Sequence, residues 1–175
     1  MHISRALCSI VGVAAFALAA PSANAQNIEF VAILAGANEV PPNASPGTGL
    51  TRAILNTASG ELTVSSTTFS GLLTNAIAAH IHPGPPGVNG PVLFPFDGVP
   101  NATSGTIPSH TFVLTEDQQS VLIAGDMYVN VHSVDLPGGE IRGQLAVVPE
   151  PATFLLMGSG LMVLGVAMRR RMSRT

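Results

Sequence analysis

Alternation of apolar and polar residues dominates the middle of the chain and predicts β-strands. In residues 61–69, Leu62 and Val64 alternate with Thr63 and Ser65, which is the period-two pattern of a strand with one buried face. Further strand segments are predicted at 28–35, 50–56, 76–82, 111–114, 126–133 and 140–147. Short strands separated by Gly- and Pro-rich turns favour an all-β fold, an antiparallel β-sandwich.

One short segment interrupts this pattern and predicts a helix. Thr115 is a suitable N-cap, Glu116 and Asp117 place acidic groups in the first turn, and Gly125 provides the stop. Residues 83–106 form a long Pro- and Gly-rich stretch. Loops of this length in compact domains tend to be functional or to wrap a site.

The N-terminal zone, residues 1–25, differs in composition and is interpreted as a secretory signal helix. Arg5 precedes the apolar run 6–20, and Ala23-Asn24-Ala25 forms an A-x-A site that predicts cleavage between Ala25 and Gln26. A permanent anchor is disfavoured because the run is short and ends at Pro21. The mature domain is therefore expected at 26–147, exported.

The C-terminal zone, residues 148–175, combines an apolar run at 152–168 with a basic end containing four arginines. The run is just long enough for a transmembrane helix, and the arginines are expected to stay on the cytoplasmic side. A buried core helix is the alternative, but the basic tail would then have no place. We expect a membrane-anchored domain outside the cytoplasm.

Charge excludes one class of partner. Between residues 26 and 148 the only basic side chains are Arg52 and Arg142, against nine acidic residues, and the chain contains no lysine. The net charge of about −7 cannot neutralise phosphates, so no nucleic-acid partner is expected. Cys8 is the only cysteine, which leaves the mature domain without a disulfide or a cysteine zinc site.

Three histidines form the main candidate site. His80 and His82 would share one face of a strand, roughly 6–7 Å apart. In 126–133 the same rule places Tyr128, Asn130 and His132 on one face. If His132 joins the pair, the three imidazoles suit copper or zinc better than calcium or magnesium.

Arg142 and two acidic residues accompany this candidate site. Glu140, Arg142 and Gln144 would share a face of the strand that follows 126–133, so the two polar faces should adjoin. Glu140 or Asp135 would orient an imidazole or complete the ligand set. Arg142 would contact an anion.

Other interpretations of the same residues stay open. The histidines would serve instead as structural hydrogen-bonding groups, with Arg142 in an ion pair with Glu140 or Asp135. A pocket for a glycan or small anion is a third interpretation. No catalytic serine elbow or carboxylate pair is identifiable, so an enzymatic role is uncertain and less favoured than a binding role.

Four stretches, residues 34–42, 79–82, 128–132 and 137–145, together resemble the CHRD domain, a family named for chordin. They occur in the family's order and span most of residues 28–147, with Ser133 where the family usually has Thr. The resemblance implies an immunoglobulin-like or superoxide-dismutase-like sandwich and no established reaction.

A weaker similarity is to copper–zinc superoxide dismutase. It would make His80, His82 and His132 copper ligands, with Arg142 guiding an anion. The disulfide cysteines and a clear zinc loop are missing here, so dismutase activity itself is not expected.

The C-terminal zone resembles the PEP-CTERM sorting signal of Gram-negative bacteria. The residues that carry the resemblance are Pro149, Glu150 and Pro151, followed by the apolar run and the basic end. This implies recognition by an exosortase-type enzyme and an intermediate anchored in the inner membrane. Removal of the anchor would deliver the domain to the cell surface or to an exopolysaccharide matrix.

The sequence thus predicts a surface-sorted, non-enzymatic binding or structural module. The alternative is a copper- or zinc-binding metalloprotein with a three-histidine site.

Overall fold

The computed structural model describes residues 26–149. The predicted signal helix at 1–25, most of the predicted sorting motif and the predicted membrane helix at 152–168 lie outside these residues. Within the described part, no helix is long and apolar enough to cross a membrane.

Antiparallel strands make up most of the described chain, as the alternating pattern predicts. The elements in chain order are β1 (Asn27–Ala35), the 3-10 turn η1 (Gly36–Asn38), β2 (Thr48–Asn56), β3 (Glu61–Ser70), β4 (Ala76–Pro83), β5 (Phe94–Pro95), β6 (Gly105–Ile107), β7 (His110–Val113), α1 (Glu116–Ile123), β8 (Met127–Ser133), β9 (Ile141–Gln144) and β10 (Ala146–Val147).

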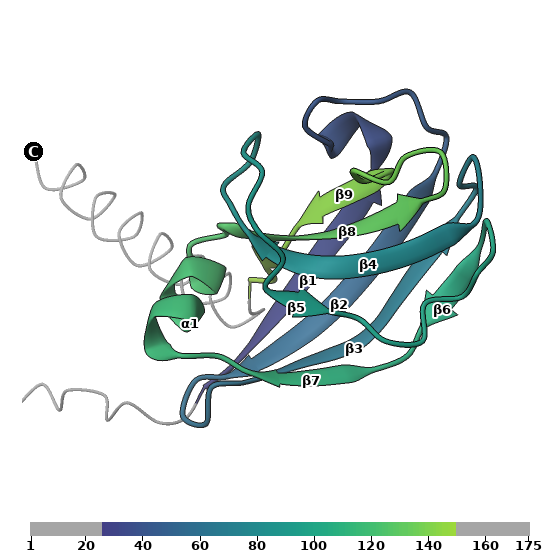
Figure 1. Cartoon of the computed structure of the whole chain (residues 1–175). Coiled ribbons are helices and arrows are strands. Elements are labelled where there is room, and N and C mark those ends of the chain that lie inside the picture. Colours follow the sequence, from purple (N-terminus) through teal and green to yellow (C-terminus); the bar gives the residue numbers. More distant parts are fainter. Residues whose placement is uncertain (1–25, 150–175) are drawn as a thin grey trace, which may run out of the picture.

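The strands follow the order β5-β4-β8-β9-β1-β2-β3-β6, with β10 paired to β1 and β7 paired to β3. The sheet curls so that β4, β8 and β9 cross over β1, β2 and β3 (Figure 1). The join between the two halves is narrow, because β1 and β9 share a single register pair, Ala35 with Arg142. This arrangement confirms the predicted all-β sandwich.

The inward faces of both halves supply the core. Leu34, Leu55 and Leu62 come from one half, and Ile81 and Val129 from the other; all five are fully buried. Since neighbouring residues of a strand point to opposite faces, the residues between the core positions of β4 and β8 lie on the outer face.

The helix is confirmed at its predicted position. Thr115 accepts a hydrogen bond from the Gln118 backbone, and the Gln118 side chain accepts one from the Thr115 backbone, a reciprocal capping box. Gly125 follows the helix with φ +83°, which a residue with a Cβ adopts only with strain.

The last predicted strand is divided in two. Residues 140–147 were expected as one strand, but β9 ends at Gln144 and β10 begins at Ala146. The backbone N–H of Leu145 donates to the carbonyl of Met127, while Ala146 pairs with Val31 of β1. The chain therefore changes partner strand at Leu145.

Two loops cover the outer face of β4, β8 and β9. The first is the segment after β1, which contains η1, and the second is the segment between β4 and β5 (Figure 1). Because of this cover, Asn130 and His132 are buried although they point away from the core. The first part of the Pro- and Gly-rich stretch 83–106 thus covers the site, while its remainder contains β5 and the start of β6 and is not the continuous loop that was predicted.

Candidate functional site

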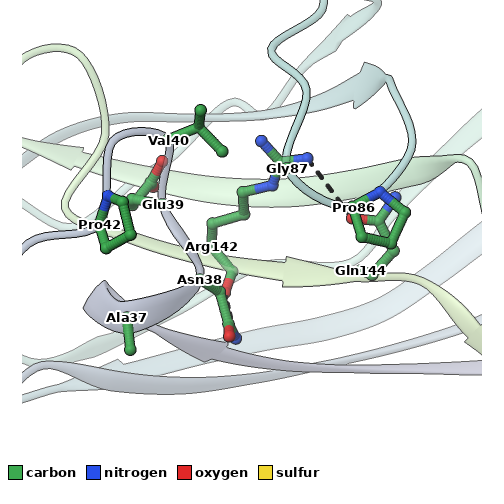
Figure 2. A pocket seen from close by; sticks show the side chains of 9 residues that line it. All are labelled: Ala37, Asn38, Glu39, Val40, Pro42, Pro86, Gly87, Arg142 and Gln144. Carbon is green, nitrogen blue, oxygen red and sulfur yellow. Dashed lines mark hydrogen bonds between the residues drawn. The ribbon is translucent and has the colours of Figure 1, made fainter.

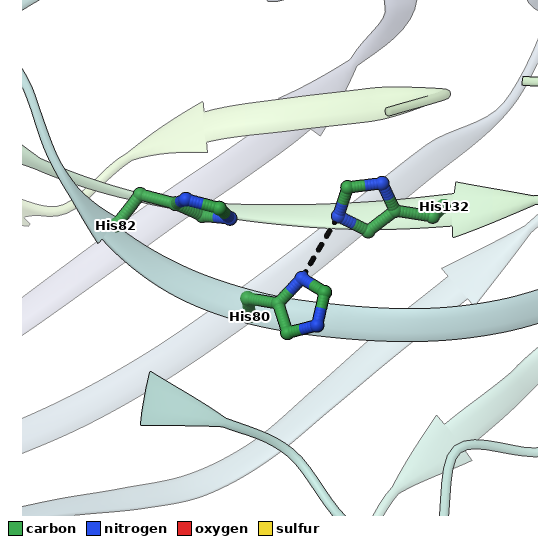
Figure 3. Close-up of side chains that lie close together, drawn as sticks. All are labelled: His80, His82 and His132. Atoms are coloured by element: carbon green, nitrogen blue, oxygen red, sulfur yellow. Dashed lines mark hydrogen bonds between the residues drawn. The ribbon is translucent and has the colours of Figure 1, made fainter. Parts of the chain in front are cut away.

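The three predicted histidines come together on the covered outer face (Figure 3). His80 and His82 lie on β4, and β4 pairs with β8 in the register that places Ala78 opposite His132 and His80 opposite Asn130. One ring nitrogen of each histidine lies within 4.8 Å of the other two. Residues 52 positions apart in the sequence thus become direct neighbours.

Backbone carbonyls fix two of the imidazoles. Nδ1 of His132 donates to the carbonyl of Pro137 at 2.9 Å, and Nδ1 of His82 donates to the carbonyl of Gly90 at 3.1 Å. A neutral imidazole carries one proton, so Nε2 of both rings presents a lone pair to the cluster. A carbonyl bond on the far nitrogen is the usual way in which a metal-binding histidine is oriented.

Gly90 reaches His82 because it has no side chain. A Cβ at this position would collide with the carbonyl of Pro83, so only glycine allows the loop to fold this tightly onto β4. The Gly90 backbone also donates to the Tyr128 hydroxyl at 3.1 Å. The loop is therefore tied to both β4 and β8.

His80 completes the cluster. Its Nδ1 lies 2.9 Å from Nε2 of His132 and donates to it. Burial, together with the neighbouring His132 and His82, lowers the pKa of His80 to about 4. Burial also lowers the pKa of His132, partly offset by its bond to Pro137. Neutral imidazoles, the form that binds metal, are thus favoured here.

Arg142 lies on the same face, one strand further along. Its guanidinium carbon is 3.4 Å from the centre of the Tyr128 ring, and His82 stacks on the same tyrosine with ring centres 4.9 Å apart. Arg142 donates to the carbonyls of Pro85 and Val88 and to Oδ1 of Asn89. At 1% exposure it holds the loop down, rather than pairing with Glu140 or Asp135.

The two predicted acidic partners of the histidines point elsewhere. The Glu140 carboxylate is fully buried and accepts hydrogen bonds at 2.6 Å from the Ser45 hydroxyl and the Leu73 backbone. Asp135 is exposed, and its backbone N–H bonds Thr74. The orienting acceptor of His132 is instead the carbonyl of Pro137. Sequence spacing could not distinguish a carbonyl of the turn from the carboxylates beside it.

Two segments of the chain match known protein-family models. Residues 30–145 match the model of the CHRD domain. The chain belongs to the CHRD domain family. Residues 147–171 match the PEP-CTERM protein-sorting motif, which marks an exported protein that is processed by an exosortase and sorted to the surface of a Gram-negative cell. A search of curated proteins found no match.

A pocket of about 490 Å³ opens beside Arg142 in the CHRD domain (Figure 2). It is lined by Ala37, Asn38, Glu39, Val40, Pro42, Pro86, Gly87, Arg142 and Gln144. Both covering loops therefore contribute to its walls.

Glu39 is a buried acid that sequence reasoning did not select. Burial raises its pKa to about 7, against the opposing charge of Arg142 and a backbone bond at Val40. Within residues 26–149 its Oε1 has no hydrogen-bond partner, and a Cβ at Gly139 would lie 2.6 Å from this oxygen. The only feature of the sequence that pointed to Glu39 was its position in the first CHRD-like stretch, residues 34–42.

His110 lies outside the histidine cluster of the CHRD domain. Its Nε2 accepts from the Asp97 backbone at 2.9 Å, and its Nδ1 donates to the carbonyl of Pro108 at 2.8 Å. With both nitrogens occupied by backbone groups, this histidine has a structural role.

Proposed function

We propose that this CHRD domain is an exported binding module that holds one copper or zinc ion through His80, His82 and His132. The observation that carries the proposal is the convergence of three ring nitrogens within 4.8 Å of one another. Ligands on opposite sides of one ion lie about 4 Å apart, since each metal–nitrogen bond is about 2 Å. Binding therefore requires an inward movement of the imidazoles of about 1 Å for ligands on opposite sides of the ion and about 1.5 Å for the tetrahedral geometry of zinc.

The chemistry of the donor set favours a late first-row transition metal. The three donors are imidazoles, which suit copper and zinc, whereas calcium and magnesium prefer oxygen. For Nδ1 of His80 to bind the ion, the proton that it donates to His132 must move to Nε2 of the same ring, because a ligating nitrogen is unprotonated. The lowered pKa of both residues keeps both rings in the neutral form that binds metal.

The role proposed for this ion is binding rather than catalysis. The loop residues that cover the cluster, together with the buried Arg142, leave His82 6% exposed and His132 8% exposed. Such cover suits retention of an ion more than turnover of a substrate.

The export and sorting signals of the protein lead to further proposals about its processing and final location. We infer cleavage between Ala25 and Gln26 during export, followed by an intermediate anchored in the inner membrane by residues 152–168. Exosortase-type processing near Pro149, Glu150 and Pro151 would then release the domain, residues 26–147, to the cell surface or an exopolysaccharide matrix. The presence of the sorting motif supports this route.

Metal analysis of the exported protein tests the proposed site. After loading with copper or zinc and removal of loosely bound ions, we expect about one ion per chain. His80→Ala and His132→Ala should each abolish this stoichiometry. His110→Ala is the matched control, since its backbone contacts place it outside the cluster. Absence of stoichiometric metal in the folded wild type would overturn the proposal.

A further inference from the structure

Asn130 occupies the middle of the histidine cluster. It is the register partner of His80 across the β4–β8 pair, and it precedes His132 by two residues on the same face. Its Oδ1 lies 3.0 Å from Nε2 of His82. At 3% exposure the amide is buried like His82 and His132, with the half-buried His80 beside it, so it is a fourth polar group of the same site.

The contact between Asn130 and His82 brings two electron-rich atoms together. Nδ1 of His82 already donates to the carbonyl of Gly90, so Nε2 of the neutral ring carries a lone pair. An amide oxygen also offers only lone pairs. Two acceptors at this distance repel each other unless the amide is turned so that its nitrogen donates to Nε2, or a cation lies beside both lone pairs.

The hydrogen bonds of His82 go to uncharged groups, Gly90 and Asn130. A metal ion would satisfy both lone pairs at once, with the amide oxygen already beside Nε2.

We propose that Asn130 is the fourth ligand of the ion, through Oδ1. This inference rests on the proposed function of the histidine cluster. The 3.0 Å separation of the two atoms equals the distance between two ligands that meet at a right angle on an ion about 2.1 Å from each. The spacing of these two atoms is therefore compatible with neighbouring ligand positions on one ion. Right-angled nitrogen and oxygen ligands are typical of tetragonal copper(II).

Asn130 variants of the full-length exported protein test this inference with copper(II) as the probe. Competition with a chelator of known affinity gives the dissociation constant. We expect Asn130→Ala to weaken copper binding by about ten- to a hundredfold, and Asn130→Asp, which keeps an oxygen in place and adds charge, to bind at least as tightly as wild type. Thr51→Val is the control, because it removes a buried hydroxyl pair with Thr67 in the other half of the sandwich.

A spectroscopic measurement on the wild type makes the test independent of variant folding. Electron paramagnetic resonance of the copper(II) form is recorded in ordinary water and in water enriched in the magnetic oxygen isotope. If Asn130 holds the fourth position, the isotope leaves the equatorial signal unbroadened. Broadening would show that water holds this position and would overturn the inference.

The outcomes separate the two proposals. No copper in folded wild type removes the proposed function and this inference together. Stoichiometric copper in wild type with unchanged affinity in Asn130→Ala keeps the metal site and overturns the role of Asn130, whose amide would then only donate to His82 from its nitrogen. Weakened binding in Thr51→Val as well would point to general stability and also count against it.

Discussion

Nδ1 of His80 lies 2.9 Å from Nε2 of His132. Nδ1 of His132 is held by Pro137, so the proton of this contact belongs to His80. The two imidazoles are therefore neutral and directly hydrogen-bonded to each other. They lie on β4 and β8, which are adjacent in the sheet and distant in the sequence.

The metal-free domain should lose stability in mild acid because of this couple. The pKa of His80 is about 4 in the folded protein and 6.5 in its ordinary state, so the unfolded chain binds more protons between these values. The contribution of His80 to the free energy of unfolding is fully present above about pH 6.5 and decreases as the pH drops toward about 4. His132 shifts in the same direction. The measurement is urea unfolding of wild type and His80→Asn across this range. A difference between them that does not change with pH would contradict the prediction.

The contribution of Glu39 to stability should change with pH in the opposite direction. Its pKa is about 7 when folded and 4.5 ordinarily, so the folded state binds more protons between these values. Its contribution is complete below about pH 4.5 and is lost as the pH rises through about 7. Glu39→Gln should remove this dependence and raise stability at pH 8 by on the order of 2 kcal/mol. Glu29→Gln, at an exposed position, is the control. Equal pH profiles for wild type and Glu39→Gln would refute the prediction.

Arg142→Lys should be destabilising although it keeps the charge. The guanidinium bonds Pro85, Val88 and Asn89 at once, and a single ammonium cannot reproduce that fork. We expect a loss of about 2–4 kcal/mol in unfolding free energy by urea titration. The exposed Arg52 offers the matched change, and Arg52→Lys should stay within about 0.5 kcal/mol of wild type. A similar loss of unfolding free energy in both variants would contradict the proposed role of Arg142 in anchoring the loop.

Gly90→Ala should disturb the loop and the metal site together. The added methyl group meets the carbonyl of Pro83, so the loop must shift and His82 loses its acceptor. We expect about 1–3 kcal/mol of destabilisation and weaker copper binding. A Cβ on Gly138 would meet no atom of the described residues within 4 Å, so Gly138→Ala serves as the control. Wild-type copper affinity in Gly90→Ala would show that the loop does not orient His82.

Thr115→Ala should lower stability without touching the site. It removes the side-chain half of the capping box at α1, which costs about 1 kcal/mol. Thr115→Ser keeps the hydroxyl and should therefore keep most of the wild-type stability. Thermal unfolding measures the loss, and copper stoichiometry should remain that of wild type. Lost copper in Thr115→Ala would mean that the helix and the histidine cluster are coupled.

Local patterns in the sequence determined most of the secondary structure. Alternation identified the strands around Leu62 and Val129, and the capping residues at Thr115 identified the helix, because strand faces and helix caps depend on neighbours a few residues away. The same period placed His80 and His82 on one face. The CHRD and PEP-CTERM resemblances were also readable from contiguous residues, and both are confirmed by the family matches.

Only the tertiary structure decided which distant groups meet. Strand order is set by packing of the whole sheet, so the sequence could raise but not settle whether His132 on β8 lies beside His80 on β4. The orientation of Glu140 toward Ser45, the burial of Glu39 and the reach of Gly90 to His82 depend on how two loops fold over one face. Periodicity carries no information on such contacts, because it records which face a residue takes and not which residue faces it.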